Sequence, residues 1–336
     1  MEHYMRDHLT EEIIDKAMKL YDIEANTIHF LGGFENFVFE YVKHGISYIL
    51  RFVHSNHRPY EHVLAELEFI DYLHEKGASV SNVVHSIHDH IVEQVDIDDT
   101  QYFTIAVFDK APGSYVKPED ITPEFWRSFG VEVGRMHRLT KDFKPKHKRP
   151  HWYEENFMDI AKRSLEEDDM DILEMFEQIT TEIKSLPVTS DNYGLIHTDL
   201  HFNNLYYDNG RFTFFDFDDS AYKHFLSDIA IILYYYHMQK RKKIVTTKDM
   251  EYYQSVRDIL GWFLSGYETE YHLDRTFFRY LNVFLSLRSV VLYVVLVAAG
   301  YKHHDDERYR NFCVEAKMRA LHRLMEVDLD FVLKGL

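Results

Sequence analysis

A group of polar residues lies between short apolar runs in the middle of the sequence: His197, Asp199, Asn204 and Asp216. Asn204 follows Asp199 by five residues, and Asp216 follows Asn204 by twelve. Carboxylate and amide oxygens are ligands that Mg²⁺ accepts, and a carboxylate can take the proton of an attacking hydroxyl group. Phosphoryl transfer needs both, because negative charge gathers on the phosphate oxygens in its transition state.

The spacing of these residues matches the catalytic segment of protein kinases. There, an H-x-D-x-x-x-x-N loop supplies the base and one metal ligand, and an aspartate one β-hairpin later supplies another ligand. His197, Asp199 and Asn204 reproduce the loop, and the turn signal Asp208-Asn209-Gly210 precedes Asp216. We therefore predict that Asp199 is the catalytic base and that Asn204 and Asp216 are Mg²⁺ ligands. A lone H-x-D would mean little, whereas the joint pattern is specific.

The catalytic segment, Ile196–Asn204 followed by Phe214–Asp218, resembles the aminoglycoside phosphotransferase and choline kinase superfamily. These small-molecule kinases share the protein-kinase fold, and their loop reads H-G-D-L-H-x-x-N with the metal-binding aspartate in I-D-F-[ED]. Here Thr198 stands in place of the usual glycine and Phe215 in place of isoleucine. Weaker matches follow the order of the family over most of the chain: Leu31–Asn36, Tyr48–Arg51, Ala65-Glu66, Val133–His137 and Asp228–Ala230.

The resemblance implies an ATP site in the first hundred residues, with ATP and Mg²⁺ as cofactors. Gly32 and Gly33 match the nucleotide loop, where a backbone without Cβ atoms can approach phosphate oxygens. Arg51 stands where kinases carry the lysine that contacts the α- and β-phosphates, and Glu66 is its expected partner. The plainer interpretation is a hairpin turn, a strand-end arginine and a solvated glutamate.

Further residues near the catalytic segment keep two interpretations. Asp218 and Asp219 contact the metal or the substrate, or they are solvated turn residues. The role of His201 stays open. His197 and Asp228 are expected to shape the loop by hydrogen bonding rather than to act in acid–base chemistry.

Aromatic residues are frequent in the second half of the sequence. Next to an acidic site they could enclose a quaternary ammonium group, but packing in a helical core is their commoner use. His137 is likewise expected to be a hydrogen-bonded core residue. The aromatic positions concerned are Tyr234–Tyr236, Tyr252-Tyr253, Trp262-Phe263 and Tyr293.

The composition of the 336 residues is that of a globular protein, with 46% hydrophobic and 15% aromatic residues. The formal charge of −18 argues against nucleic acid and anionic membranes as partners, and it favours a small cationic substrate. The single cysteine, Cys313, excludes an intrachain disulfide. Met1–Thr10 lacks the apolar core of a signal peptide, and the apolar run Ser289–Gly300 is shorter than the about 20 residues that span a bilayer. We therefore expect a buried helix there and a cytoplasmic protein.

The first 108 residues predict two helices and several short strands. Turn signals such as Gly32-Gly33 and His44-Gly45 separate runs rich in aromatic and β-branched residues. The predicted helices are Thr10–Leu20, capped by Thr10, and Tyr60–Lys76. The predicted strands are Thr27–Leu31, Phe37–Val42, Ser47–Val53, Ile91–Val95 and Tyr102–Phe108.

The remainder is predicted to be mainly helical, with a β insert at Leu195–Phe217 and an exposed loop at Lys141–Pro150. The sequence therefore predicts an α+β, bilobal protein-kinase-like fold. Residues 1–108 would form the nucleotide-binding lobe and residues 109–336 the catalytic and substrate-binding lobe. The predicted helices are Pro123–Leu139, Glu154–Ser164, Met170–Leu186 and a series from Lys223 to the end.

We predict an ATP-dependent phosphotransferase that acts on a hydroxyl group of a small molecule. The acceptor would be an amino alcohol, a sugar or amino sugar, a homoserine-like amino acid or an antibiotic. A protein kinase is disfavoured because no A-P-E segment follows Asp216. A non-catalytic nucleotide-binding regulator is the alternative, favoured only by Arg51 and Thr198. A two-metal phosphatase or nuclease would need more clustered ligands.

Overall fold

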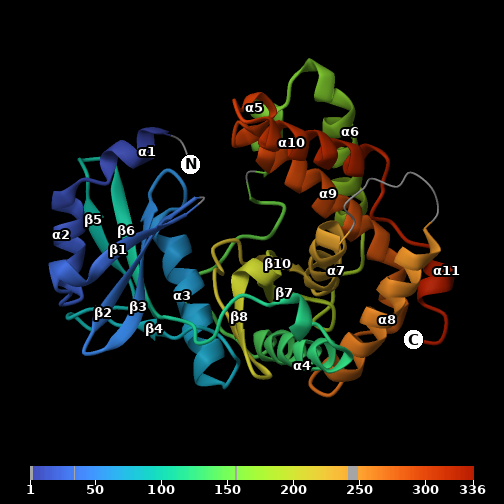
Figure 1. Cartoon of the computed structure of the whole chain (residues 1–336), viewed down its shortest axis with the longest axis horizontal. Helices are drawn as coiled ribbons and strands as arrows, with labels where there is room; N and C mark the ends of the chain where they lie inside the picture. Colours follow the sequence, from blue (N-terminus) through green and yellow to red (C-terminus); the bar gives the residue numbers. More distant parts are fainter. Residues whose placement is uncertain (1–2, 34, 156, 241–248) are drawn as a thin grey trace. The chain divides into compact units, whose positions relative to one another are not determined.

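The computed structural model describes residues 3–33, 35–155, 157–240 and 249–336, which form two compact units (Figure 1). Unit 1 comprises Met1–Tyr115, Asp142–Arg149 and Leu205–Asp218; unit 2 comprises Val116–Lys141, Pro150–Asn204 and Asp219–Leu336. The predicted boundary at residue 108 assigned residues 109–115, 142–149 and 205–218 to the second lobe, whereas here they pack with unit 1. Some predicted features lie outside the described residues: Phe34 of the glycine loop, Asn156 and the part of the helical series at 241–248.

Unit 1 is built on an antiparallel sheet with the strand order β1-β2-β3-β6-β4, in which β5 also pairs with β6. The predicted strands are confirmed. The sequence missed β4, because two residues are too few to show an alternating pattern. The strands are β1 Ile28–Gly32, β2 Phe37–Lys43, β3 Ile46–His54, β4 Val83–Val84, β5 Glu93–Asp96 and β6 Tyr102–Asp109.

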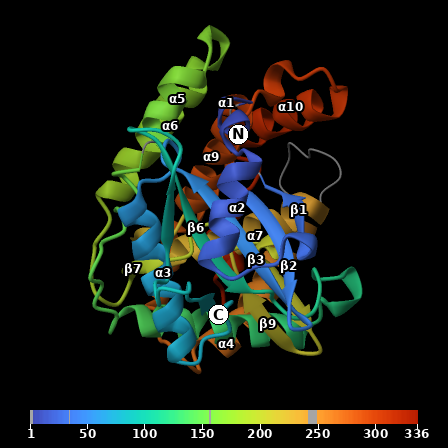
Figure 2. The ribbon, with the colours of Figure 1, turned by 90° about the vertical axis from the view of Figure 1, so that its left-hand side faces the viewer.

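Helices pack on this sheet because each buries one apolar stripe. Helix α2 (Glu11–Leu20) lies across one face of the sheet (Figure 2), and its Ile13, Ala17 and Met18 join the core of the strands. The predicted cap is present, since the Thr10 hydroxyl accepts a hydrogen bond from Ile13 N at 3.3 Å. Helix α3 (Tyr60–Glu75) buries an apolar stripe that includes Val63, Leu67, Ile70 and Leu73. A short helix, α1, covers His3–His8.

A β-hairpin formed by β8 (Leu205–Asp208) and β9 (Arg211–Phe214) completes unit 1. Its turn residues Asn209 and Gly210 have φ values of 47° and 91°, the left-handed pair that a two-residue hairpin turn requires. Phe214 is fully buried and forms a parallel bridge to Val80. The β insert and its turn signal are therefore confirmed.

The segment Lys141–Pro150 contains no helix or strand, as predicted, but the expectation that it is exposed throughout is wrong at Arg149. Arg149 is 3% exposed. Its guanidinium donates to the carbonyl oxygens of His62 at 3.0 Å and Asp218 at 2.5 Å. These hydrogen bonds compensate for the burial of its charge.

Unit 2 is mainly helical and contains one two-stranded antiparallel sheet of β7 (Tyr193–Ile196) and β10 (Ala221–His224). The prediction of a helical series from Lys223 is wrong at its start, because residues 221–224 pair with β7 and the helix begins at Leu226. The helices are α4 Pro123–Thr140, α5 Phe157–Ser164, α6 Met170–Lys184, α7 Leu226–Lys240, α8 Met250–Tyr267, α9 Leu281–Ala298, α10 Glu307–Leu321 and α11 Leu329–Val332.

Helices α4 and α8 pack closely because glycines stand at their crossing. A Cβ atom on Gly134 would lie 2.6 Å from the carbonyl oxygen of Tyr267, and one on Gly266 would lie 1.8 Å from that of Arg127. The glycine of the Val133–His137 match is thus explained by backbone packing. His137, one turn further, donates to or accepts from the Tyr267 hydroxyl at 2.8 Å.

Helix α9 is the central helix of unit 2 and contains the predicted apolar run except for its last two residues, Ala299 and Gly300. Within the described residues, the stretch Arg275–Ala298 is long and apolar enough to cross a membrane by length and composition alone. The most apolar 18 residues of this stretch are 72% buried inside the protein, as in a core helix. The expected buried helix is confirmed, and it is longer than the run that predicted it.

Candidate active site

The loop that follows β7 has a conformation that explains one departure from the family sequence. Thr198 has a φ of 65°, the left-handed region that glycine adopts without strain. Its N–H donates to Asp228 Oδ1 at 2.9 Å, and its hydroxyl donates to the carbonyl oxygen of Asp219. These two hydrogen bonds hold the turn, so a threonine is accommodated where the family usually has glycine.

The next residue, Asp199, is surrounded by three polar side chains of unit 2. Asn204 Nδ2 donates to the Asp199 carbonyl oxygen at 3.0 Å and to Oδ2 at 2.9 Å. His201 Nε2 lies 3.1 Å from the same Oδ2. Arg288 Nη2 donates to Oδ1 at 2.5 Å. The structure therefore brings the predicted base into direct contact with one predicted metal ligand.

Arg288 comes from α9, far away in the sequence, and holds Asp199 in its charged form. Burial alone would raise the pKa of Asp199, but the charges of Arg288 and His201 hold that pKa well below its usual range. Arg288 is itself fixed, because its Nε donates to the Tyr235 hydroxyl at 3.0 Å and its guanidinium lies 4.8 Å from the centre of the Tyr235 ring. Asp199 is thus a fixed carboxylate.

The second predicted metal ligand, Asp216, follows β9 in unit 1 and has a φ of 64°. Leu205, the first residue of β8, pairs with Phe214, the last residue of β9. Asn204 immediately precedes Leu205, and Asp216 follows Phe214 by two residues. The two predicted ligands therefore flank the open end of one hairpin, Asn204 before its first strand and Asp216 after its second.

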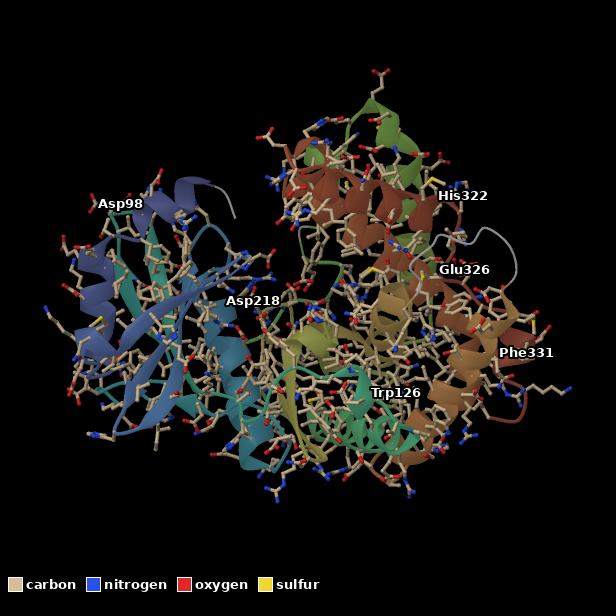
Figure 3. The ribbon with its side chains drawn as sticks, in the orientation of Figure 1. Asp98, Trp126, Asp218, His322, Glu326 and Phe331 are labelled. Carbon is tan, nitrogen blue, oxygen red and sulfur yellow. The ribbon has the colours of Figure 1, made fainter. Side chains whose placement is uncertain are left out.

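Asp218, labelled in Figure 3, is a buried and ion-paired residue of unit 1. Its Oδ2 lies 2.7 Å from His57 Nε2 and 3.5 Å from Arg58 Nε. Burial would raise the pKa of Asp218, but Arg58 and His57 hold it well below its usual range. The interpretation of Asp218 as a solvated turn residue is therefore wrong.

Arg51 of β3 and Glu66 of α3 form the expected pair in unit 1. Two parallel hydrogen bonds join them, from Nη1 to Oε1 at 2.9 Å and from Nη2 to Oε2 at 2.7 Å. The side chains are 6% and 0% exposed. Burial would lower the pKa of Arg51, but the charge and hydrogen bonds of Glu66 raise it. The plainer interpretation, with a solvated glutamate, does not hold.

The predicted nucleotide loop joins β1 to β2. Gly32 and Gly33 have φ values of 120° and 144°, which side-chain-bearing residues rarely adopt. A Cβ atom on Gly33 would lie 1.9 Å from the carbonyl oxygen of Asn36. Both glycines are thus required by the backbone, and their contact with a nucleotide stays a prediction.

The residues expected to shape the loop do so. Asp228 accepts hydrogen bonds from the backbone N–H groups of His197 and Thr198, and the His197 ring accepts one from Asp199 N at 3.4 Å. His137, buried in the core, contacts Asp228 Oδ2 at 3.2 Å. These contacts fix the loop backbone around Asp199.

The aromatic residues mostly pack in the core of unit 2, as expected. Tyr236 contacts Trp126, labelled in Figure 3, with ring centres 5.0 Å apart, and Tyr293 is 1% exposed. Tyr235 is different, because it lies at the site. The Arg288 guanidinium covers the face of its ring, so that face does not serve an ammonium group.

Sequence reasoning missed two cations at this site, Arg288 and Lys223. Arg288 had a signal, since a charged residue beside a long apolar run is buried only when it is paired. Lys223 had none, because its position depends on the pairing of β10 with β7. Both residues line a cavity of about 360 Å³ that is formed within unit 2.

Comparison with known proteins gives consistent matches. Residues 27–259 match the model of the phosphotransferase enzyme family. The amicoumacin kinase of Bacillus subtilis (strain 168) is 32% identical over 289 residues, which cover 85% of this chain and 84% of that protein.

Solved structures of kinases resemble the chain over nearly its whole length. The amicoumacin kinase hAmiN in complex with AMP-PNP, Ca²⁺ and Ami has a TM-score of 0.88 at 29% identity, with 98% of each chain covered. A microcompartment-associated aminopropanol kinase has a TM-score of 0.70 at 18% identity, with 94% of this chain and 95% of that chain covered. The second likeness concerns the fold alone. The α+β kinase-like fold predicted from the sequence is confirmed.

Proposed function

The chain belongs to the phosphotransferase enzyme family and is a small-molecule kinase, and on that premise we propose that it transfers the γ-phosphate of ATP to a hydroxyl group of amicoumacin or a similar compound. The likeness to two amicoumacin kinases supports this acceptor. The observation that carries the mechanism is the Asp199 carboxylate. Asn204 and Arg288 hold it in place, and Arg288 also lines a cavity of unit 2.

We assign the role of base to Asp199. The acceptor hydroxyl gives its proton to a carboxylate oxygen of Asp199 as its own oxygen bonds to the γ-phosphorus. The bond between that phosphorus and the bridging oxygen of ADP breaks, and ADP leaves. A positioned base of this kind contributes roughly 10²- to 10⁴-fold to a rate. Asn204 and Arg288 keep the carboxylate in one orientation, which lowers the entropic part of the barrier.

The donor set fits a divalent cation, which we propose to be Mg²⁺ held by Asn204 and Asp216. Amide and carboxylate oxygens are hard ligands of the kind that Mg²⁺ and Ca²⁺ take. The amide nitrogen of Asn204 is already committed to Asp199, so its Oδ1 is the atom that remains for a cation. When bound, the cation neutralises charge that builds up on the phosphate oxygens.

For the nucleotide we propose Gly32, Gly33, Arg51 and Glu66. The glycine loop would lie against the phosphates through its backbone N–H groups. Arg51 would contact the α- and β-phosphates while Glu66 keeps its guanidinium in place through two hydrogen bonds. Because the pair is already formed, the cation needs no further ordering when the nucleotide binds.

The non-catalytic alternative rested on Arg51 and Thr198. Arg51 forms two hydrogen bonds with Glu66 and so provides an ion pair in place of the lysine–glutamate pair of kinases, and Thr198 has the left-handed conformation that glycine adopts without strain. Neither departure removes a group that the proposed reaction needs. No observation in the described residues favours the alternative.

The test is ADP release from ATP and Mg²⁺ by the purified full chain with amicoumacin, and with an aminopropanol as second acceptor. We expect amicoumacin to stimulate ADP release. Asp216→Asn should slow it roughly 100-fold or more, because a metal ligand contributes several kcal/mol to the transition state. The control Asp305→Asn, at an exposed position, should match the unaltered chain. Binding of the Mg²⁺–nucleotide without any acceptor-stimulated release would instead support the non-catalytic regulator.

A further inference from the structure

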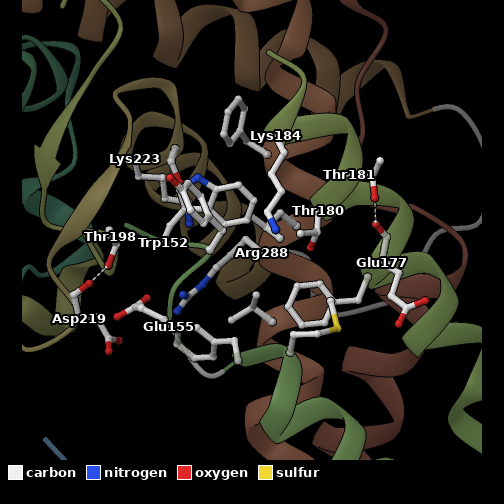
Figure 4. Close-up of a pocket in the computed structure, with 18 of the residues that line it drawn as sticks. Trp152, Glu155, Glu177, Thr180, Thr181, Lys184, Thr198, Asp219, Lys223 and Arg288 are labelled. Atoms are coloured by element: carbon white, nitrogen blue, oxygen red, sulfur yellow. Dashed lines mark hydrogen bonds between the residues drawn. The ribbon is translucent and has the colours of Figure 1, made fainter. Parts of the chain in front are cut away.

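The cavity of unit 2 has the size and lining of a small-molecule site (Figure 4). Its volume of about 360 Å³ falls within the range of about 300–1,000 Å³ that is typical of ligand pockets. Aromatic side chains form much of its wall, among them those of Trp152, Tyr153, Phe176 and Phe284. Arg288 lines the same cavity and donates to Asp199 Oδ1 at 2.5 Å. A molecule in this space therefore lies next to the residue that holds the proposed base.

Lys223 is the cation of this cavity without a fixed partner. Its ammonium lies 5.8 Å from the centre of the Trp152 ring, and it makes no hydrogen bond or ion pair with any other residue of the described ranges. Burial lowers the pKa of Lys223 to about 8, although the carboxylates of Glu155, Asp228 and Asp219 act to raise it. An ammonium group in such a place is stabilised by an oxygen that accepts its hydrogen bonds.

The other cations that line the cavity are already engaged. Lys162 lies 3.6 Å from Glu177, and both side chains are about half exposed, at 53% and 54%. Lys184 is exposed and lies over the Tyr153 ring at 5.2 Å. Arg288 is bound to Asp199. Among the cations of the cavity, Lys223 is therefore the one that remains for an oxygen of a ligand, although the carboxylates of Glu155 and Asp219 line the same cavity.

We propose that this cavity binds the phosphate acceptor and that Lys223 donates a hydrogen bond to a negatively charged or carbonyl oxygen on an aromatic acceptor. The identification of the ligand as the acceptor rests on the proposed function; the preference for such an oxygen rests on the cavity alone. Lys223 and Arg288 would repel an ammonium group placed against them. The substrate expected from the net charge of −18, a small cation, is thus disfavoured next to Lys223 and Arg288.

The experiment compares two ligands that share a phenol ring and differ in charge, 4-hydroxyphenylacetate and tyramine. Their binding to the full chain is measured by calorimetry at neutral pH, without nucleotide. We expect 4-hydroxyphenylacetate to bind roughly 10-fold or more tightly than tyramine, because one hydrogen bond to a charged group changes an affinity by about this factor. Lys223→Met should abolish this preference, and Lys223→Arg should retain it. Lys148→Met, the same change at an exposed lysine outside the cavity, should leave it unaltered.

Equal or tighter binding of tyramine by the unaltered chain would overturn the proposal, as would failure of 4-hydroxyphenylacetate to bind at millimolar concentration. An unchanged preference in a folded Lys223→Met variant would also overturn it. If that variant does not fold, the unaltered chain and Lys223→Arg still decide the outcome. A chain that prefers the carboxylate but phosphorylates no acceptor would contradict the proposed function and leave the preference of the cavity standing.

Discussion

His224, the last residue of β10, provides a quantitative test of how unit 2 is held together. It is 1% exposed and lies among aromatic rings, with Phe277 stacked at 5.3 Å and Tyr193 edge-on at 5.0 Å. Neither ring nitrogen has a hydrogen-bond partner of good geometry within the described residues, and the backbone of Pro187 offsets only part of the effect of burial on the pKa. Burial lowers the pKa of His224 from 6.5 to about 4. The folded protein therefore contains the neutral imidazole.

The contribution of His224 to the pH dependence of the free energy of unfolding follows from that pKa shift. The shift is about 2.5 pKa units, and one unit corresponds to about 1.4 kcal/mol, so the full effect is roughly 3 kcal/mol. Between pH 6.5 and pH 4 the unfolded chain binds a proton at this site that the folded chain does not. The free energy of unfolding is thus unaffected by His224 above pH 6.5 and falls as the pH decreases towards 4. At pH 4.5 the loss amounts to about 2.5 kcal/mol.

The assay is urea unfolding of the unaltered chain and of His224→Phe between pH 8 and pH 4.5. Other carboxylates titrate in both proteins, so the quantity of interest is the difference between the two free energies of unfolding. That difference should shift by about 2.5 kcal/mol in favour of the variant as the pH falls. His88→Gln, at an exposed histidine, is the control and should show no such shift. A constant difference between the chain and His224→Phe over this pH range would refute the reasoning.

Three further predictions concern other buried contacts. Arg51→Met leaves the Glu66 carboxylate buried and unpaired, so the free energy of unfolding in urea should fall by about 3–5 kcal/mol. The double variant Arg51→Met with Glu66→Gln should recover part of this loss. Equal losses in the single and the double variant would contradict the account of this ion pair. Thr198→Gly should keep its acceptor-dependent rate, since glycine adopts positive φ freely, and a large loss of rate would contradict this. Asp169, 0% exposed, accepts from Lys302 and Lys317, and its pKa is held below the usual range, although burial would raise it. Asp169→Asn should therefore lower the free energy of unfolding at neutral pH, as measured by urea unfolding. The difference from the unaltered chain should shrink as the pH falls below about 3.8, the pKa of an unfolded aspartate. A difference that does not change with pH would contradict this.

The hairpin of the predicted catalytic segment was predictable because its information is local. The spacing of Asp199, Asn204 and Asp216, and the turn between the last two, follow from the chain itself. The pairing of Arg51 with Glu66 was also predictable, because a strand and the next helix carry them in a known order. Those interpretations needed no knowledge of which distant segments meet.

The rest depended on contacts between distant segments. Arg288 meets Asp199 across 89 positions of the sequence, and no local pattern specifies that meeting. Lys223 was predicted to begin a helix, but its segment pairs with β7, and this pairing directs Lys223 to the cavity. The left-handed conformation of Thr198 was hidden because a threonine gives no turn signal. Tertiary contacts therefore determined both the polar surroundings of the proposed base and the walls of the cavity.

The most direct test of the central claim is to measure nucleotide binding and phosphoryl transfer on one preparation of Asp199→Asn. Asparagine keeps the size of the side chain but cannot take the proton of the acceptor. We predict that the variant binds ATP with Mg²⁺ as the unaltered chain does and transfers phosphate to the acceptor roughly 10²- to 10⁴-fold more slowly. Transfer at the unaltered rate would contradict the assignment of Asp199 as the base.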